Sequence, residues 1–220
     1  MIKILNDYLD IDTQKNLLDW FNTDDGLLFL TEDVTIQGNK VNWDTKKLLN
    51  LEEPPCGLKW LLDNVIGAEW ILEEFFAASG NQKVQIHADS GDVSKNPSYA
   101  VYIALEQEVQ DNYTIFFDNY WKGNAAKFVR AASAHTERYN INKRITDYSD
   151  VVNYTDKPFD LTIYNRYLQH IPYENLHGLT THSIVKNVPG TVMIWPRSML
   201  HCGANSSSKK LFITMFLNKK

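Results

Sequence analysis

Two histidines and one aspartate, His87, Asp89 and His201, have the residue types and spacing of a facial metal site. Two imidazoles and one carboxylate fill one face of an octahedral Fe(II) and leave three positions open for a bidentate co-substrate and O2. The segment Lys83–Asp89 predicts a strand, and residues i and i+2 of a strand point to the same side. It therefore presents an imidazole and a carboxylate together, and the fold must bring His201 to them from far downstream.

The segment that leads to His201 has a pattern of its own. Pro189-Gly190 predicts a tight turn, and Thr191–Trp195 is an apolar strand that ends at a proline. A short connection then delivers His201. Shortly afterwards Lys209-Lys210 opens another apolar strand, so basic side chains follow the third candidate ligand at a fixed distance.

These motifs together resemble the 2-oxoglutarate/Fe(II)-dependent dioxygenase superfamily, whose pattern is His-x-Asp, a long gap, a second His and a basic residue roughly ten positions later. The resemblance covers residues 84–217, and no residue decides between the prolyl-hydroxylase-like and phytanoyl-hydroxylase-like branches. It implies a double-stranded β-helix (jelly roll) core and Fe(II) held by His87, Asp89 and His201. It also implies a hydroxylase that uses O2, converts 2-oxoglutarate to succinate and CO2, acts on an unidentified small-molecule or protein substrate, and takes ascorbate as reductant.

The same resemblance assigns a basic residue to the distal carboxylate of 2-oxoglutarate. Lys210 is favoured over Lys209, because strand parity places it on one face with Phe212 and Thr214. The family's commonest pattern has Arg followed two residues on by Ser or Thr, so this chain replaces a bidentate guanidinium with a point charge. Tyr102, on the strand after the His-x-Asp segment, is a further candidate for binding this carboxylate.

The elements that must position these residues predict an α+β protein. Asp12 or Thr13 predicts the cap of a helix through Phe21, and Pro54-Pro55 starts a second helix that runs to about Phe76. We therefore expect residues 1–80 to be mainly helical support. From residue 83 the apolar period changes to two, which predicts a jelly-roll core over 83–217 in a single domain, 1–220. The expected strands are Lys83–Asp89, Tyr99–Glu106, Tyr113–Phe117, Leu179–Val185, Thr191–Trp195 and Leu211–Leu217.

Residues 118–158 form a long polar stretch between two core strands. Loops of this length are uncommon unless they are functional or disordered. We expect part of the stretch to be a lid over the metal, in which Arg130, Arg138 and Arg144 would meet an acidic substrate. Deleting Gly123–Asn142 would then abolish turnover and leave iron binding intact.

Composition excludes several other classes. Of the 220 residues, 44% are apolar and 22% charged, as in folded soluble proteins. The net charge of -5 argues against binding of nucleic acid through phosphate contacts. Cys56 and Cys202 form no disulfide framework and favour a reducing compartment. No apolar run approaches the ~20 residues that span a bilayer, so we expect a cytoplasmic protein; the oligomeric state stays open.

Two other functions compete with the oxygenase. A cupin-like jelly-roll binding module without oxygenase activity is the main alternative, but cupins pair two closely spaced histidines where this chain has Asp89. A vestigial member is the second, and the intact His-Asp-His set argues against it. His182 also lies on an expected strand, but it lacks a basic residue at the right distance. Surface or hydrogen-bonding roles are expected for His135, His170 and His177.

Overall fold

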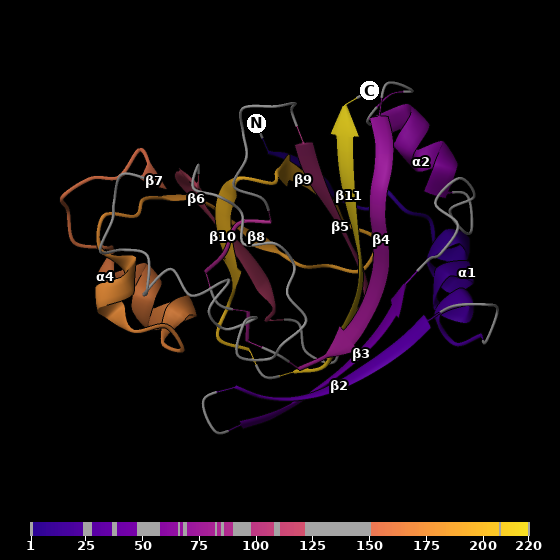
Figure 1. Ribbon diagram of the computed structural model, residues 1–220, viewed down its shortest axis with the longest axis horizontal. Helices are drawn as coiled ribbons and strands as arrows, with labels where there is room; N and C mark the ends of the chain where they lie inside the picture. Colours follow the sequence, from indigo (N-terminus) through magenta and orange to yellow (C-terminus); the bar gives the residue numbers. More distant parts are fainter. Residues whose placement is uncertain are drawn as a thin grey trace.

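Two antiparallel β-sheets face each other in the computed structural model and enclose the inner core of the protein (Figure 1). Helical segments cover the outer faces of both sheets. The residues that the structure describes are 2–23, 28–36, 39–47, 58–65, 67, 70–81, 83–84, 86–89, 98–107, 111–121, 151–206 and 208–219.

The larger sheet has seven strands in the order β1-β9-β5-β11-β4-β3-β2, and every neighbouring pair is antiparallel. Its centre is β11, which pairs along almost its whole length with both β4 and β5. The strands are β1 Lys3–Leu5, β2 Leu28–Ile36, β3 Asn39–Lys47, β4 Trp70–Gly80, β5 Ser98–Gln107, β9 Val192–Pro196 and β11 Lys210–Lys219.

The smaller sheet has four strands, with β6 paired to β10, β7 and β8. Its strands are β6 Tyr113–Trp121, β7 Val151–Val152, β8 Thr181–Lys186 and β10 Met199–Gly203. The chain passes repeatedly between the sheets: β4 and β5 lie in the large sheet, β6 and β8 in the small one, β9 in the large, β10 in the small and β11 in the large.

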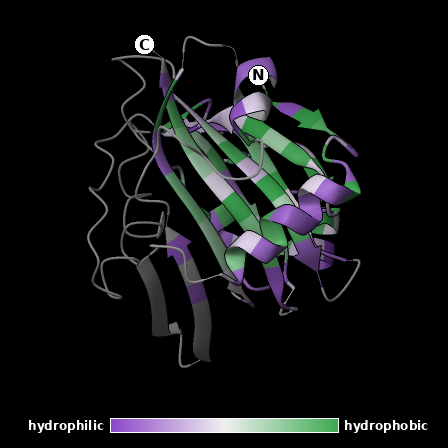
Figure 2. Cartoon of the chain, turned by 90° about the vertical axis from the view of Figure 1, so that its right-hand side faces the viewer, coloured by the Kyte–Doolittle hydropathy of each residue, from purple (hydrophilic) through white to green (hydrophobic). Residues whose placement is uncertain are grey.

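Helices α1 (Ile11–Phe21) and α2 (Leu58–Val65) cover the outer face of the large sheet (Figure 1). Leu17 and Leu58 are fully buried there against the side chains that alternate strands turn outward. Figure 2 views this side and shows largely hydrophobic strands beneath the helices. The buried residues of this outer layer are Leu9, Leu17, Leu58, Phe75, Ala77, Val101, Ile103, Leu105, Val192, Ile194, Leu211, Ile213, Met215 and Leu217.

On the opposite side of the molecule, the short helices α4 (Leu161–Ile163), η3 (Tyr164–Leu168) and η4 (Tyr173–Leu176) lie beyond the small sheet (Figure 1). Leu168 and Leu176 pack there against outward-facing side chains of β6 and β10. These residues form a second outer layer, and a third group of buried residues fills the space between the two sheets.

The inner layer follows from strand parity. On β11, Leu211, Ile213 and Met215 join the layer beneath the helices, so the alternate residues point between the sheets. The same alternation brings side chains of both sheets together. The buried residues of the inner layer are Ala78, Ala100, Tyr102, Ala104, Phe116, Val185, Met193, Trp195, Met199, Phe212 and Phe216.

The expectation that residues 1–80 are mainly helical is wrong. The helix expected to run to Phe76 ends at Val65, because Gly67 takes a left-handed conformation (φ 91°) that ends helices. Trp70–Gly80 then forms β4, whose pairing with β3 and β11 on both sides outweighs its helical spacing. The β2–β3 hairpin occupies most of the remaining described chain before α2.

Three smaller expectations also change. The cap of α1 is Asp10, not Asp12 or Thr13, because its carboxylate accepts the N–H of Thr13 at 2.7 Å. The connection expected before His201 is strand β10. The segment expected as strand Lys83–Asp89 forms only an isolated bridge through residue 87 among its described residues.

The proposed lid lies largely outside the described residues. Residues 122–150, with Arg130, Arg138 and Arg144, belong to that part of the chain. No described helix is long and apolar enough to cross a membrane.

Candidate metal centre

A backbone bridge between the two sequence motifs brings His87 and His201 side by side. The N–H of each residue donates to the carbonyl of the other at 2.9 Å, as in a hydrogen-bonded antiparallel pair. The N–H of Gly203 donates to the carbonyl of Val84 at 3.1 Å and extends the pairing along β10. As a result the two imidazole rings lie 4.1 Å apart between their centroids.

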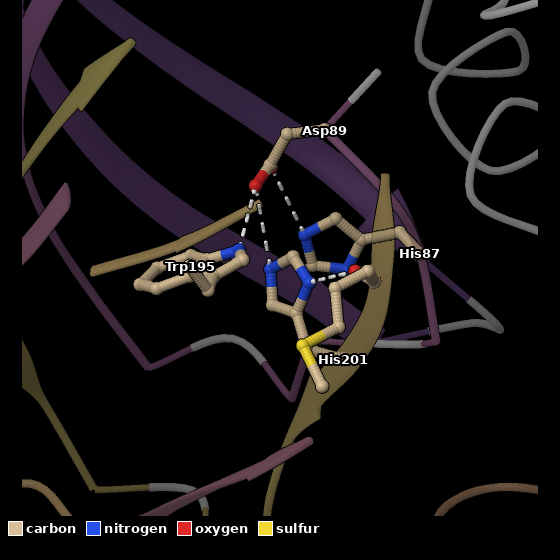
Figure 3. Close-up of polar contacts among 5 residues, drawn as sticks. His87, Asp89, Trp195 and His201 are labelled. Carbon is tan, nitrogen blue, oxygen red and sulfur yellow. Dashed lines mark hydrogen bonds and ion pairs between the residues drawn. The ribbon is translucent and has the colours of Figure 1, made fainter. Parts of the chain in front are cut away.

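Asp89 completes a cluster of three donors (Figure 3). Its Oδ1 lies 3.7 Å from Nε2 of His87, and its Oδ2 lies 3.7 Å from Nε2 of His201. All three ligand atoms lie within 4.8 Å of one another, and this is the one such cluster found among the described residues. Neighbouring donors on an octahedral ion lie about 3 Å apart at bond lengths of about 2.1 Å. Small side-chain rotations would therefore close the set around one ion, and its chemistry suits Fe(II).

His201 is prepared to act as a neutral ligand. Its Nδ1–H donates to the carbonyl of Met199 at 3.0 Å, which directs Nε2 toward Asp89. Burial lowers its pKa from 6.5 to about 4, although the hydrogen bond to Met199 acts in the opposite direction. At neutral pH the imidazole is uncharged, as a metal ligand must be.

Aromatic side chains of the inner layer surround the cluster. The ring of Phe116 lies 5.8 Å from that of His201, and the indole of Trp195 lies 5.0 Å from it, edge to face. Trp195 also donates its indole N–H to Oδ2 of Asp89 at 3.1 Å (Figure 3). Sequence reasoning missed this contact, since Val192–Trp195 is apolar on both faces of the strand and gives no sign of a polar partner.

Lys210 lies between the sheets, as strand parity predicts, whereas Lys209 is exposed. Lys210 is 8% exposed, and burial lowers its pKa from 10.5 to about 8. Its Nζ lies 5.6 Å from the ring of Phe212 and 3.9 Å from the position that a Cβ on Gly203 would occupy. No carboxylate among the described residues forms an ion pair with it. Gly203 is two residues beyond His201, so this ammonium lies on the side of β10 that carries the cluster.

Tyr102 lies beside Lys210 in the same layer. Its ring stacks on that of Phe212 at 5.0 Å, and the residue is 8% exposed. Burial raises the pKa of its hydroxyl, which has no hydrogen-bond partner within the described part of the chain. The ammonium of Lys210 and the hydroxyl of Tyr102 thus lie on the inner face of the large sheet, and the described residues offer neither of them a polar partner.

The other described histidines lie outside the cluster. His182 pairs with Asp118 at 2.6 Å on the exposed side of the small sheet, and His177 contacts the hydroxyl of Tyr154 at 3.0 Å. Burial, followed by the charges of the nearby lysines, lowers the pKa of His170 to about 4. His135 falls outside the described residues.

Comparisons with known proteins identify the fold. No protein-family model and no curated protein matches the sequence. HygX from Streptomyces hygroscopicus, crystallised with nickel and 2-oxoglutarate, matches over 100% of this chain and 83% of its own, with a TM-score of 0.50 and 10% identity. SnoN, an alpha-ketoglutarate-dependent epimerase from nogalamycin biosynthesis, matches over 99% and 78%, with a TM-score of 0.52 and 11% identity. The carbocyclase SnoK from the same biosynthesis matches over 99% and 79%, with a TM-score of 0.50 and 10% identity. The expected resemblance to 2-oxoglutarate-dependent oxygenases is therefore confirmed as a likeness of fold.

Proposed function

We propose that this protein is an Fe(II)- and 2-oxoglutarate-dependent oxygenase built on a double-stranded β-helix. The observation that carries the proposal is the meeting of His87, Asp89 and His201 between two facing sheets, with donor atoms within 4.8 Å of one another. The repeated passage of the chain between the sheets is typical of a jelly roll. The likeness of fold to HygX, SnoN and SnoK supports the same assignment.

Each donor has a separate task in this proposal. His201 ligates through Nε2 and is held in place by Met199, while His87 is fixed by its backbone bridge. Asp89 supplies the single negative charge. When bound, Fe(II) and 2-oxoglutarate would supply the oxidising chemistry with O2, and 2-oxoglutarate would leave as succinate and CO2. The protein contributes positioning, and the rings of Phe116 and Trp195 exclude water from this side of the cluster.

Lys210 is the proposed partner of the distal carboxylate of 2-oxoglutarate, and Tyr102 the proposed second donor. A buried ammonium needs a counter-charge, and none is supplied by the described residues. The hydroxyl of Tyr102 likewise lacks a hydrogen-bond partner there. A carboxylate would satisfy both groups at once. Lys209 is exposed and is the weaker candidate.

Hydroxylation of a small-molecule or protein substrate is the proposed reaction. SnoN is named an epimerase and SnoK a carbocyclase, so this fold supports more than one outcome on the substrate. Whatever happens to the substrate, the proposed reaction consumes 2-oxoglutarate. This consumption can be tested before the substrate is known.

The decisive experiment measures succinate formed from 2-oxoglutarate in the presence of Fe(II), ascorbate and O2, without added substrate. We expect slow turnover by the wild-type protein and none by His87→Ala. His182→Ala is the matched control, because His182 lies on the exposed side of the small sheet in a pair with Asp118, and it should retain turnover. Absence of bound iron in the wild-type protein would overturn the proposal in favour of a binding module.

A further inference from the structure

We propose that Trp195 is a positioning residue for the metal site, whose indole N–H makes Asp89 bind the ion through one oxygen only. This inference rests on the proposed function. It concerns how many coordination positions of the ion the protein occupies, because this number decides how many stay open for a co-substrate and O2.

The contact singles out one oxygen of the carboxylate. Each carboxylate oxygen of Asp89 lies 3.7 Å from the Nε2 of one histidine, Oδ1 from His87 and Oδ2 from His201. The indole N–H donates to Oδ2 at 3.1 Å, and this contact distinguishes the two oxygens. Figure 3 shows the carboxylate of Asp89 facing the indole nitrogen of Trp195 and both imidazoles. The two oxygens are therefore not equivalent before any ion arrives.

The donor is itself held rigidly. Trp195 is 3% exposed and is paired to Ala100 of β5 by the register of the large sheet. The ring of Phe116 packs against it at 5.2 Å, and the ring of His201 at 5.0 Å. Backbone pairing and ring contacts thus fix the direction of the N–H, so the carboxylate must adapt to the indole.

The consequence concerns coordination number. A carboxylate can bind a metal through one oxygen or through both. A carboxylate oxygen that already accepts a hydrogen bond from an N–H has less electron density to donate to a metal ion. The ion is therefore expected to bind through the other oxygen. Single-oxygen binding by Asp89, with the two histidines, leaves three positions of an octahedral ion open, as a bidentate 2-oxo acid and O2 require. A carboxylate that bound through both oxygens would block one of the three.

A test must separate the N–H from the ring that carries it. Trp195→Phe removes the donor but also removes ring volume. Replacing Trp195 by β-(3-benzothienyl)alanine, in which sulfur stands in place of the N–H, removes the donor and keeps the shape. Trp70→Phe is the matched control, since Trp70 packs on Tyr99 in the layer beneath the helices, at 5.0 Å between ring centroids.

Co(II) is the probe, added to the metal-free proteins, with its affinity measured by calorimetry and its geometry by the visible ligand-field spectrum. Loss of a partner of a ligand typically weakens metal binding about 10- to 100-fold. We expect this loss in both variants at position 195, with a changed spectrum and weaker binding of 2-oxoglutarate to the Co(II)-loaded protein. Trp70→Phe should match the wild type in all three measurements.

Each outcome bears on a different statement. Wild-type affinity and spectrum in the benzothienyl variant would overturn the inference, because the ring alone would then suffice. Failure of the wild-type protein to bind Co(II) would instead overturn the proposed metal site. Unfolding curves of the metal-free proteins show whether a loss of affinity in Trp195→Phe comes from general destabilisation, which the benzothienyl variant should not share.

Discussion

Lys210→Met should make the ligand-free protein more stable at neutral pH, the reverse of what deletion of a buried contact normally does. Lys210 is 8% exposed, and its charge faces the ring of Phe212 with no carboxylate paired to it among the described residues. Methionine has a similar length and no charge. The substitution therefore removes a desolvated ammonium and keeps most of the packing.

The magnitude follows from the lowered pKa. Each pKa unit is worth about 1.4 kcal/mol, so lowering the pKa of Lys210 from 10.5 to about 8 corresponds to about 3 kcal/mol of unfolding free energy. The penalty is fully present below about pH 8, where Lys210 is charged in both the folded and the unfolded state. Between about pH 8 and 10.5 the unfolded chain binds more protons, so the stability contributed by this group rises with pH. Above about pH 10.5 the penalty is gone.

Urea denaturation of the wild type and Lys210→Met from pH 6 to 11 measures this difference directly. We expect the variant to be more stable by up to about 3 kcal/mol at pH 7, with the advantage closing as the pH passes through the window above. Lys209→Met is the control, because that side chain is exposed and its loss should change stability by less than about 0.5 kcal/mol. With Co(II) bound, 2-oxoglutarate should stabilise the wild type and not Lys210→Met.

A less stable Lys210→Met at pH 7 would refute this reasoning, because it would mean that the ammonium has a favourable partner in the folded protein. An advantage that stays constant across the pH range would also contradict it. The change would then act through packing and not through charge.

Three further predictions concern the support of the site. Gly178→Ala should cost more unfolding free energy than Gly67→Ala in urea denaturation. Both glycines have a positive φ, which costs an alanine about 1–2 kcal/mol, but a Cβ at Gly178 would also displace the ring of Tyr154, whereas Gly67 has open space around it. Lys46→Met should destabilise the protein by about 2–4 kcal/mol in the same assay, since it leaves the carbonyls that end α1 without a buried donor. Thermal stability should fall as the pH drops from 6.5 towards 4, because the pKa of His170 is lowered to about 4 in the folded protein and the unfolded chain therefore binds the proton more readily. His170→Gln should make this fall less steep. An unchanged dependence on pH would show that His170 does not contribute to it.

The pairing of His87 with Asp89 could be predicted from the sequence because it depends on short-range geometry, whereas His201 could be assigned only through the family resemblance. The spacing of His87 and Asp89 places them together on any extended segment, and the parity of β11 separates Lys210 from Lys209. Both arguments use the period of a strand and nothing about its neighbours. The structure agrees with them even though residues 83–89 form no regular strand among their described positions.

Features that depend on contacts between distant segments could not be predicted from the sequence. Trp70–Gly80 satisfies helical and extended spacing alike, and only its two partner strands decide between them. The hydrogen bond from Trp195 to Asp89 joins strand β9 to a segment that belongs to neither sheet, and β9 contains no polar pattern. A single sequence does not encode such a contact in its local periodicity.

Two buried lysines of this protein differ in their partners, and the difference separates a structural role from a proposed binding role. Lys46 is fully buried, and its ammonium donates to the carbonyls of Trp20, Phe21 and Thr23, where α1 ends. Lys210 is nearly as buried, yet it has an aromatic ring in place of such acceptors and a pKa lowered to about 8. Evolution tolerates an uncompensated charge in a core chiefly where a ligand will compensate it. Burial alone therefore does not distinguish the two lysines. Lys210 differs in that no carboxylate among the described residues pairs with it, and this difference supports the proposal that an anionic co-substrate is its partner.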